Sequence, residues 1–299
     1  MSIRVLAFDL DGTLLLDGTK EIDPRTQASI ERAIEQGMHI CIASGRDRIG
    51  CKLGSDPLKL QNGQHYLSVL NGRLIYDFQK EEYDISLTMS PQDGYYIQRV
   101  CKEYGLEAII CCGFDFYSFV PATTSDFRKR LLKKTFGKPA DYGFAFKDKH
   151  TSYTDLEYEP TMLSQSITKI MFIGSGAFYR AYKNELGEKL KNYEFHMIGP
   201  RWMEIMPKGV HKAISLEKIA QRCGCTVNEI MAFGDGMNDV EMLETVGIGV
   251  AMGNAMKQVQ QRANLVTKTN NQNGIGIVID ALLEGKEEKL RSIKYIDEL

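Results

Sequence analysis

The sequence lacks the features that would assign it to a membrane, secreted or nucleic-acid-binding class. No apolar run is long enough to span a bilayer, and the N-terminus has no basic segment followed by an apolar core. The charge is nearly balanced, with 37 lysine and arginine residues against 39 aspartate and glutamate residues. A broad basic surface for nucleic acid is therefore not expected.

Patterns of metal-binding or disulfide-forming cysteines are also missing. The seven cysteines are odd in number and include no Cys-x-x-Cys pair, and none of the five histidines stands at metal-ligand spacing from another. Neither a zinc site nor a disulfide framework is expected. Reduced thiols are typical of the cytoplasm, so these absences predict a cytoplasmic protein that binds neither membranes nor nucleic acid.

What the sequence does contain is an alternation of short apolar runs and helical patterns. The run that ends at Phe8 is followed by a helix start at Asp23-Pro24 and by a second apolar run that ends at Ala43. A strand, a helix and a second strand over about thirty residues are typical of a βαβ unit with parallel strands. The alternation returns after residue 230, which predicts an α/β fold.

The length of 299 residues favours two domains. Between residues 84 and 194, strand and helix patterns continue without an acid-rich motif. We therefore predict a core formed by residues 1–83 and 195–299, into which a second domain, residues 84–194, is inserted. Within these domains we expect strands at 66–70, 74–76, 108–117, 169–173 and 202–206, helices at 91–104, 178–190 and 255–263, a less regular region after residue 46, and a surface helix or a disordered tail from residue 285.

Two carboxylates follow the first apolar run directly. Asp9 and Asp11 stand two residues apart, and Gly12 ends the regular pattern. The carboxyl end of a parallel strand is where α/β sheets bind ligands, and two acids this close require a cation, a shared proton or both. A helix-loop-helix calcium loop is excluded because Thr13 and Leu14 stand where that loop has a ligand and a glycine. A catalytic or metal-binding role and a solvated turn both remain open at this point.

Two further signals could complete an anion site. Ser44-Gly45 ends the second apolar run, where a hydroxyl and backbone N–H groups can bind phosphate, although a plain Ser-Gly turn has the same pattern. Lys212 falls in the first turn of an expected helix, where the helix dipole disfavours a cation. This placement is reasonable if Lys212 points at an anion, and the alternative is a lysine that faces solvent.

A second acid-rich motif lies near the other end of the chain. The apolar run 230–233 is followed by Gly234-Asp235-Gly236-Met237-Asn238-Asp239. Two acids, an amide and two glycines at a strand end repeat the pattern of Asp9 and Asp11. Parallel strands would bring these strand ends to one edge of the sheet.

Together and in this order, the motifs resemble those of the haloacid dehalogenase-like superfamily of phosphotransferases. The four motifs are Asp9-Leu10-Asp11-Gly12-Thr13, Ser44-Gly45-Arg46, Lys208-Gly209-Val210-His211-Lys212, and Gly234 to Asp239. The segments 69–72 and 250–255 are similar to those of the Cof-type (IIB) phosphatases, although Arg73 stands where a small residue is usual. The resemblance covers about 1–83 and 195–285, and it implies a Rossmann-like, doubly wound parallel core with an inserted α+β cap that sets substrate specificity.

The resemblance also implies a role for each motif residue. Asp9 would be the nucleophile that forms an aspartyl-phosphate, and Asp11 would be the general acid and base. Mg²⁺ would be held by Asp9, Asp235 and the backbone carbonyl of Asp11. The phosphoryl group would be bound by Leu10, Ser44, Gly45, Asn238 and the catalytic Lys212. Thr13 would fix the turn that carries Asp11, and Asp239 would orient Lys212 or a metal-bound water.

These roles predict a phosphoric monoester hydrolase that acts on small phosphorylated metabolites such as sugar phosphates. A sugar phosphomutase is the alternative because it shares the aspartyl-phosphate step, whereas a non-catalytic phosphate sensor would be expected to lack Asp9 or Asp11. The sequence does not identify the substrate. Arg128 and Lys129 of the inserted domain could meet a second anionic group, or they could form a solvated helix face.

Overall fold

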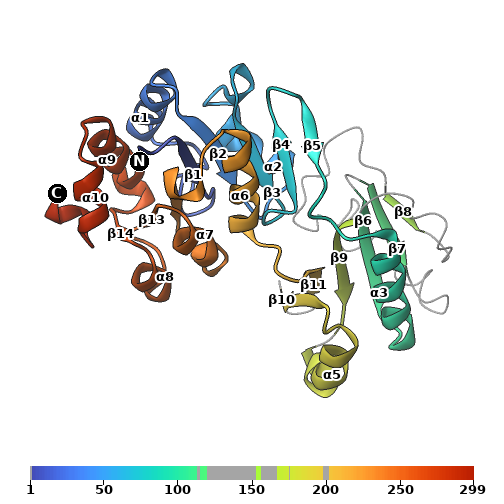
Figure 1. The fold of residues 1–299 in the computed structure, drawn as a ribbon. Coiled ribbons are helices and arrows are strands. Elements are labelled where there is room, and N and C mark those ends of the chain that lie inside the picture. Colours follow the sequence, from blue (N-terminus) through green and yellow to red (C-terminus); the bar gives the residue numbers. More distant parts are fainter. Residues whose placement is uncertain (1, 113–114, 120–152, 156–166, 175, 198–201) are drawn as a thin grey trace. The chain divides into compact units, whose positions relative to one another are not determined.

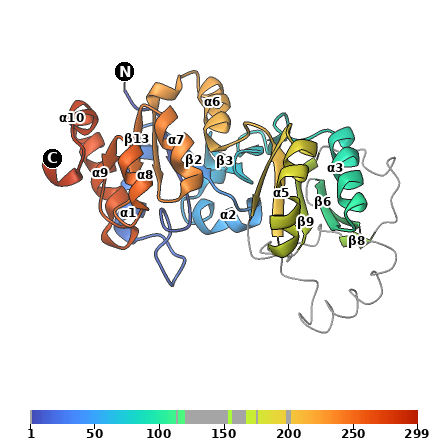
Figure 2. The same cartoon turned by 90° about the horizontal axis from the view of Figure 1, so that it is seen from below.

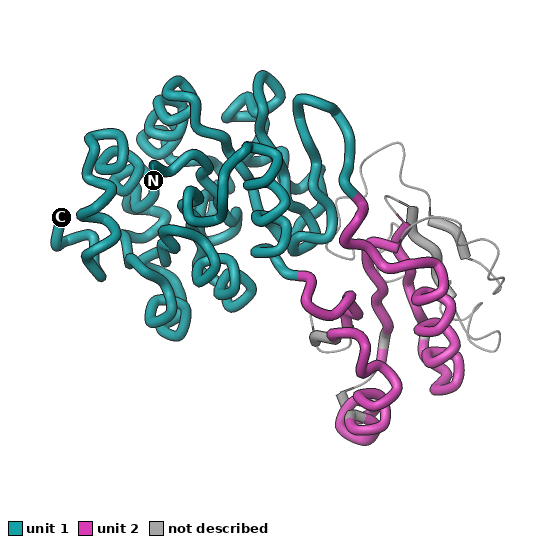
Figure 3. The backbone as a smooth tube through the Cα atoms, viewed as in Figure 1, with its two compact units in different colours: residues 1–84, 211–299 teal, residues 85–210 magenta. Residues whose placement is uncertain are grey.

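Two compact units make up the protein (Figure 3). Unit 1 comprises residues 1–84 and 211–299, and unit 2 comprises residues 85–210. The computed structural model describes residues 2–112, 115–119, 153–155, 167–174, 176–197 and 202–299 of the chain. Arg128 and Lys129 lie outside these described residues, so their predicted role stays a prediction. None of the helices described is long and apolar enough to cross a bilayer.

Unit 1 is built on an eight-stranded sheet with the order β14-β13-β12-β1-β2-β3-β4-β5 (Figure 1). The strands from β14 to β3 pair in parallel, whereas β4 and β5 extend one edge in antiparallel pairing. β1, β12 and β13 are buried along their whole length, as expected for parallel strands that are covered on both faces. The bounds are β1 (Val5–Phe8), β2 (His39–Ala43), β3 (Tyr66–Val69), β4 (Leu74–Asp77), β5 (Glu82–Asp84), β12 (Ile230–Gly234), β13 (Ile248–Ala251) and β14 (Leu265–Val266).

Helices cover both faces of this sheet. Figure 2 shows α1 and α2 on one side and α6 and α7 on the other, as right-handed crossovers in opposite directions require. α1 begins at Pro24 because the Asp23 side chain accepts the N–H of Arg25 and Pro24 has no N–H to satisfy. The bounds are α1 (Pro24–Glu35), α2 (Arg48–Ser55), α6 (Lys212–Arg222), α7 (Val240–Thr245), α8 (Lys257–Arg262), α9 (Gly274–Leu283) and α10 (Glu287–Ser292). The predicted doubly wound, Rossmann-like α/β core is thereby confirmed.

Unit 2 has its own six-stranded sheet, with the order β10-β11-β9-β6-β7-β8. Its pairs are antiparallel except for β7 with β8. α3 begins with a reciprocal cap in which Ser90 and Asp93 bond each other's backbone N–H. The bounds are α3 (Pro91–Glu103), β6 (Glu107–Cys112), β7 (Asp115–Phe119), β8 (Tyr153–Asp155), β9 (Ile167–Ile173), α5 (Gly176–Lys189), β10 (Tyr193–Met197) and β11 (Trp202–Pro207).

The structure differs from the sequence-based expectation in three places. The expected boundary at residue 194 would cut β10, because β10 pairs with β11 and β11 pairs with β9, so unit 2 extends to Val210. The expected single strand 108–117 is two antiparallel strands, β6 and β7. The region after Arg46 contains the helix α2, which is capped by the Asp47 side chain through the N–H of Gly50.

Candidate active site

Three of the motifs follow neighbouring parallel strands of unit 1. Asp9 follows β1, Ser44 follows β2 and Asp235 follows β12, and β1 lies between the other two strands. The carboxyl ends of parallel strands meet at one edge of a sheet, so these residues lie along the same edge. This edge is the candidate active site.

A buried lysine links two acids at this edge. Lys212, the first residue of α6, is 1% exposed, and its Nζ donates to Oδ1 of Asp9 and to Oδ1 of Asp239, each at 2.6 Å. Burial acts to lower the pKa of the Lys212 ammonium, but the charges of Asp239 and Asp9 outweigh burial and raise that pKa. The ammonium therefore stays charged. Lys212 points at anions and not at solvent, which explains a cation in the first turn of a helix.

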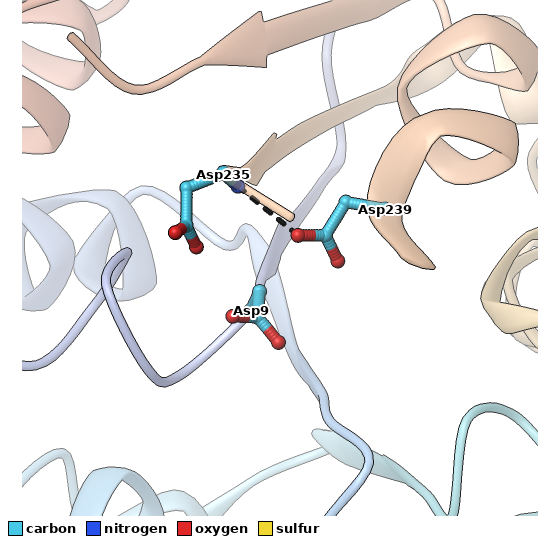
Figure 4. Close-up of side chains that lie close together, drawn as sticks. All are labelled: Asp9, Asp235 and Asp239. Atoms are coloured by element: carbon cyan, nitrogen blue, oxygen red, sulfur yellow. Dashed lines mark hydrogen bonds between the residues drawn. The ribbon is translucent and has the colours of Figure 1, made fainter. Parts of the chain in front are cut away.

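Asp239 supports this arrangement through both of its carboxylate oxygens. Oδ1 accepts from Lys212, and Oδ2 accepts the backbone N–H groups of Asp235 at 3.0 Å and Gly236 at 2.9 Å. Figure 4 shows the bond between the Asp235 backbone and the Asp239 side chain. Thr13 fixes the other side of Asp235, because its Oγ1 donates to Oδ1 of Asp235 at 2.8 Å. Asp239 and Thr13 thus hold the turn after β12 in place.

Asp9, Asp235 and Asp239 form an acidic cluster (Figure 4). One carboxylate oxygen from each lies within 4.8 Å of the others, and two of the three acids, Asp9 and Asp239, bind the buried ammonium of Lys212. Burial raises the pKa of Asp9 to about 7; Lys212 opposes this shift and the charge of Asp239 adds to it. Burial also raises the pKa of Asp235. The cluster therefore carries more negative charge than its protein contacts stabilise, and a bound cation would correct this excess.

The donor atoms of Asp9 and Asp235 fit a hard divalent cation such as Mg²⁺. Both residues use Oδ1 for their hydrogen bonds to Lys212 and Thr13, which leaves Oδ2 of each as a potential ligand atom. Gly12 provides the space: its φ is +76°, and a Cβ at this position would lie 2.4 Å from Oδ2 of Asp235. Carboxylate oxygens with few other ligands are what Mg²⁺ accepts in proteins.

Asp11 makes different contacts from those of Asp9. Arg46 binds it through two bonds, from Nε to Oδ2 at 2.6 Å and from Nη2 to Oδ1 at 2.8 Å, and Lys20 donates to Oδ1 at 2.9 Å. Partial burial acts to raise the pKa of Asp11, but the hydrogen bonds and charges of Arg46 and Lys20 outweigh it and lower the pKa. In this arrangement Asp11 is a carboxylate, ready to accept a proton.

The remaining motif residues lie around this centre in different environments. The Leu10 side chain is fully buried, so only its backbone can meet a ligand. Ser44 is buried, and its Oγ accepts the backbone N–H of Arg46 at 3.2 Å. Asn238 is exposed, lies in a 3₁₀ turn at the start of α7, and donates from Nδ2 to Oδ1 of Asn71 at 3.3 Å.

Two residues without an assigned role, Arg46 and Asn71, contact the predicted site residues. Arg46 holds Asp11, and the carboxamide of Asn71 lies against both Gly45 and Asn238. Both residues stand within segments that the family resemblance had singled out. Their partners come from distant parts of the chain, so spacing in the sequence could not reveal these contacts.

Comparisons with known proteins agree with this geometry. Residues 6–279 match the family of haloacid dehalogenase-like hydrolases. A Haemophilus influenzae protein is 30% identical over 282 residues, which cover 94% of this chain and 98% of that protein. The HMP-PP phosphatase of Klebsiella pneumoniae is 29% identical over 264 residues, 86% of each chain.

A solved structure with a similar fold is that of a sugar phosphatase of subclass IIB. It is 22% identical, with a TM-score of 0.66, and the similarity covers 93% of this chain and 98% of that one. The fold, the family match over residues 6–279 and the phosphatases among the relatives lead to one conclusion. The chain belongs to the haloacid dehalogenase-like hydrolases, and it is a phosphatase.

Proposed function

We propose that the chain is a Mg²⁺-dependent phosphatase that hydrolyses small phosphorylated metabolites, with sugar phosphates as the foremost class, through an aspartyl-phosphate on Asp9. The observation that carries this proposal is the hydrogen-bonded series Asp9–Lys212–Asp239 beside Asp235 at the carboxyl edge of the sheet. A carboxylate beside a fixed ammonium and a candidate cation site supports the role of Asp9 as nucleophile. Both are needed to bring a carboxylate up to an anionic phosphate.

In the first step, an oxygen of Asp9 attacks phosphorus while the bond from phosphorus to the ester oxygen breaks. Lys212 would stabilise the negative charge of the phosphoryl oxygens, and Ser44 and Asn238 would hydrogen-bond them. Mg²⁺ held by Asp9, Asp235 and the backbone carbonyl of Asp11 would supply further positive charge to the phosphoryl group.

Asp11 would serve both proton transfers. As an acid it gives a proton to the leaving alkoxide; as a base it then takes a proton from the water that attacks phosphorus, which frees inorganic phosphate and restores Asp9. The contacts with Arg46 and Lys20 favour the basic form of Asp11. Protonation for the first step therefore requires that these contacts loosen when substrate binds.

The substrate class is supported by the relatives and by the fold. One relative acts on HMP-PP, and a sugar phosphatase shares the fold. Both names denote small phosphorylated molecules. A screen of sugar phosphates, nucleotides and cofactor phosphates, compared by kcat/KM, would identify the preferred class.

The proposal is tested with p-nitrophenyl phosphate and with hexose phosphates, with and without Mg²⁺. We expect Mg²⁺-dependent release of inorganic phosphate, and loss of turnover in the variant Asp9→Asn while the far-UV circular dichroism is unchanged. Substantial residual turnover by Asp9→Asn would overturn the nucleophile assignment. An isomerised sugar phosphate without free phosphate would replace the phosphatase proposal by that of a phosphomutase.

A further inference from the structure

The turn after β3 holds two residues in an unfavourable backbone conformation. Leu70 has φ +54° and Asn71 has φ +58°, both in the left-handed region that residues other than glycine rarely adopt. Asparagine tolerates this region better than most residues, whereas leucine does not. Two such residues in succession are typical of a tight β-hairpin turn, which is closed here by the N–H of Gly72 donating to the carbonyl of Val69 at 3.1 Å. Leucine is unfavourable in this turn, so contacts with its surroundings must offset the strain at Leu70.

The contacts that offset the strain lead to the segment of Ser44. The backbone N–H of Leu70 donates to the carbonyl of Arg46, and the N–H of Asn71 donates to the carbonyl of Ser44, each at 3.0 Å. These two bonds tie the turn to the loop that follows β2. The conformation of the turn and the position of Ser44 are therefore fixed together.

The side chain of Asn71 reaches two other predicted phosphate ligands. Its Oδ1 accepts from Nδ2 of Asn238 at 3.3 Å. Its carboxamide also lies against Gly45, where a Cβ would be 3.1 Å from Oδ1 and 3.4 Å from Nδ2. Asn71 therefore contacts two segments, those of Gly45 and of Asn238, that are far apart in the sequence.

The next residue extends the same turn to the start of α6. Gly72 has φ +95°, and a Cβ on it would lie 2.5 Å from the carbonyl oxygen of His211, the residue before Lys212. The turn therefore touches the segments that carry Ser44, Asn238 and Lys212.

We propose that Asn71 is a positioning residue of the phosphate site, which acts by orienting the carboxamide of Asn238. One N–H of the Asn238 amide is fixed on Asn71, so the orientation of its remaining polar atoms is set before a phosphoryl group arrives. Such preorganisation spares the entropy of ordering an exposed side chain during the reaction. This inference rests on the proposed function, because it assigns Asn71 to the phosphoryl-binding step of that reaction.

The variant Asn71→Gly separates this role from a purely structural one. Glycine adopts φ +58° without strain, so the fold should be as stable as the wild type or more stable. We nevertheless expect kcat/KM for p-nitrophenyl phosphate to fall about tenfold, because Asn238 loses its partner. If Asn71 served only the backbone of the turn, Asn71→Gly would keep full activity, and that result would overturn the proposal.

A double-mutant cycle with Asn238→Ala tests the path of the effect. If Asn71 acts through Asn238, adding Asn71→Gly to Asn238→Ala should cause no further loss of kcat/KM. Losses that multiply in the double variant would show that Asn71 acts independently of Asn238 and would contradict the proposal. The matched control is Asn273→Gly, at another left-handed asparagine (φ +59°), whose side chain accepts from Thr26, a residue outside the four motifs; its activity should equal that of the wild type.

A binding measurement keeps this test separate from the proposed function. In the presence of Mg²⁺, inorganic phosphate should raise the Tm of the wild type, and Asn71→Gly should reduce this rise while Asn273→Gly keeps it. A wild type that binds phosphate but does not hydrolyse esters would refute the proposed function and leave the role of Asn71 intact. Equal rises in wild type and Asn71→Gly would refute the role of Asn71 alone.

Discussion

Each unit of the molecule buries a lysine beside acidic residues, and the two lysines differ in their surroundings. Lys212 of unit 1 is 1% exposed and begins a helix, where it contacts Asp9 and Asp239. Lys169 of unit 2 is 7% exposed and lies within β9, where it forms an ion pair at 2.9 Å with Glu204 of the neighbouring strand β11. The same side chain thus meets a cluster of acids in one unit and a cross-strand acid in the other.

The difference between the lysines lies in the charge around them. The Lys169–Glu204 ion pair joins opposite charges on two neighbouring strands and stabilises the sheet of unit 2. Lys212 binds two members of a cluster of three carboxylates, and burial raises the pKa of two carboxyls of the cluster, Asp9 and Asp235. A surplus of buried negative charge lowers the stability of the fold. Such a surplus therefore indicates a site that binds a cation or carries out catalysis.

Removing the first lysine should have the largest effect on catalysis. We expect Lys212→Met to lower kcat/KM for p-nitrophenyl phosphate by about 10³-fold, because the phosphoryl oxygens lose their fixed positive charge. Lys169→Met, measured below its unfolding temperature, is the matched control and should retain most of the activity. Near-normal kinetics in Lys212→Met would contradict the catalytic role of Lys212.

Removing the second lysine should act on stability. Lys169→Met leaves Glu204 buried without its cross-strand cation, and we expect the free energy of unfolding to fall by about 3 kcal/mol in urea titrations. The double variant Lys169→Met, Glu204→Leu should recover most of this loss, since apolar pairs can replace buried ion pairs. A double variant as unstable as the single one would mean that the pair is not the stabilising unit.

Changing the charge next to Asp11 should have a smaller effect on catalysis than removing Lys212. Arg46→Gln removes a bidentate cation that lowers the pKa of Asp11, so this pKa should rise and the proton needed in the first step should be kept to higher pH. The alkaline limb of the kcat profile should therefore shift upward. The loss of activity at neutral pH should stay below the ~10²–10⁴-fold contribution of a general acid, because Asp11 itself remains. An unchanged pH profile would argue that Arg46 does not control this proton.

A further effect is a pH dependence of stability without metal. The pKa of Asp9 rises from its ordinary value of 3.8 to about 7 on folding, so the folded state keeps a proton that the unfolded state releases between these values. Raising the pH through this window therefore destabilises the wild type. With EDTA present, the Tm of Asp9→Asn minus that of the wild type should grow by on the order of 5 °C from about pH 4 to about pH 7. A constant difference would contradict the buried, protonated state of Asp9.

Much of unit 1 could be predicted because its signals are local. The apolar runs before Asp9 and Asp235 give parallel strands, and Asp23-Pro24 begins α1 where a cap and a proline predict it. Strand ends at one edge then imply that the acids meet. The ion pair between Asp11 and Arg46 could not be predicted from the sequence, because it depends on the directions in which two side chains leave neighbouring loops.

The limits of unit 2 were harder to predict for a physical reason. The alternating pattern of residues 202–206 is typical of a half-buried strand, but it does not say which sheet the strand joins. Pairing of Trp202 with Ile173 and of Met203 with Phe172 assigns it to unit 2. Short antiparallel strands carry little information about their partners, which is also why β6 and β7 looked like one strand.

The position of β1 in the sheet has a consequence for the synthesis of the chain. β1 pairs with β2 on one side and with β12 on the other, and β12 begins only at Ile230. During translation β1 therefore has one open edge until the segment that begins at Ile230 has been made, and open edges invite pairing with other chains. Asp9 likewise meets Asp235 only after β12 has closed that edge. Binding of metal and phosphate would thus report that β12 has paired with β1.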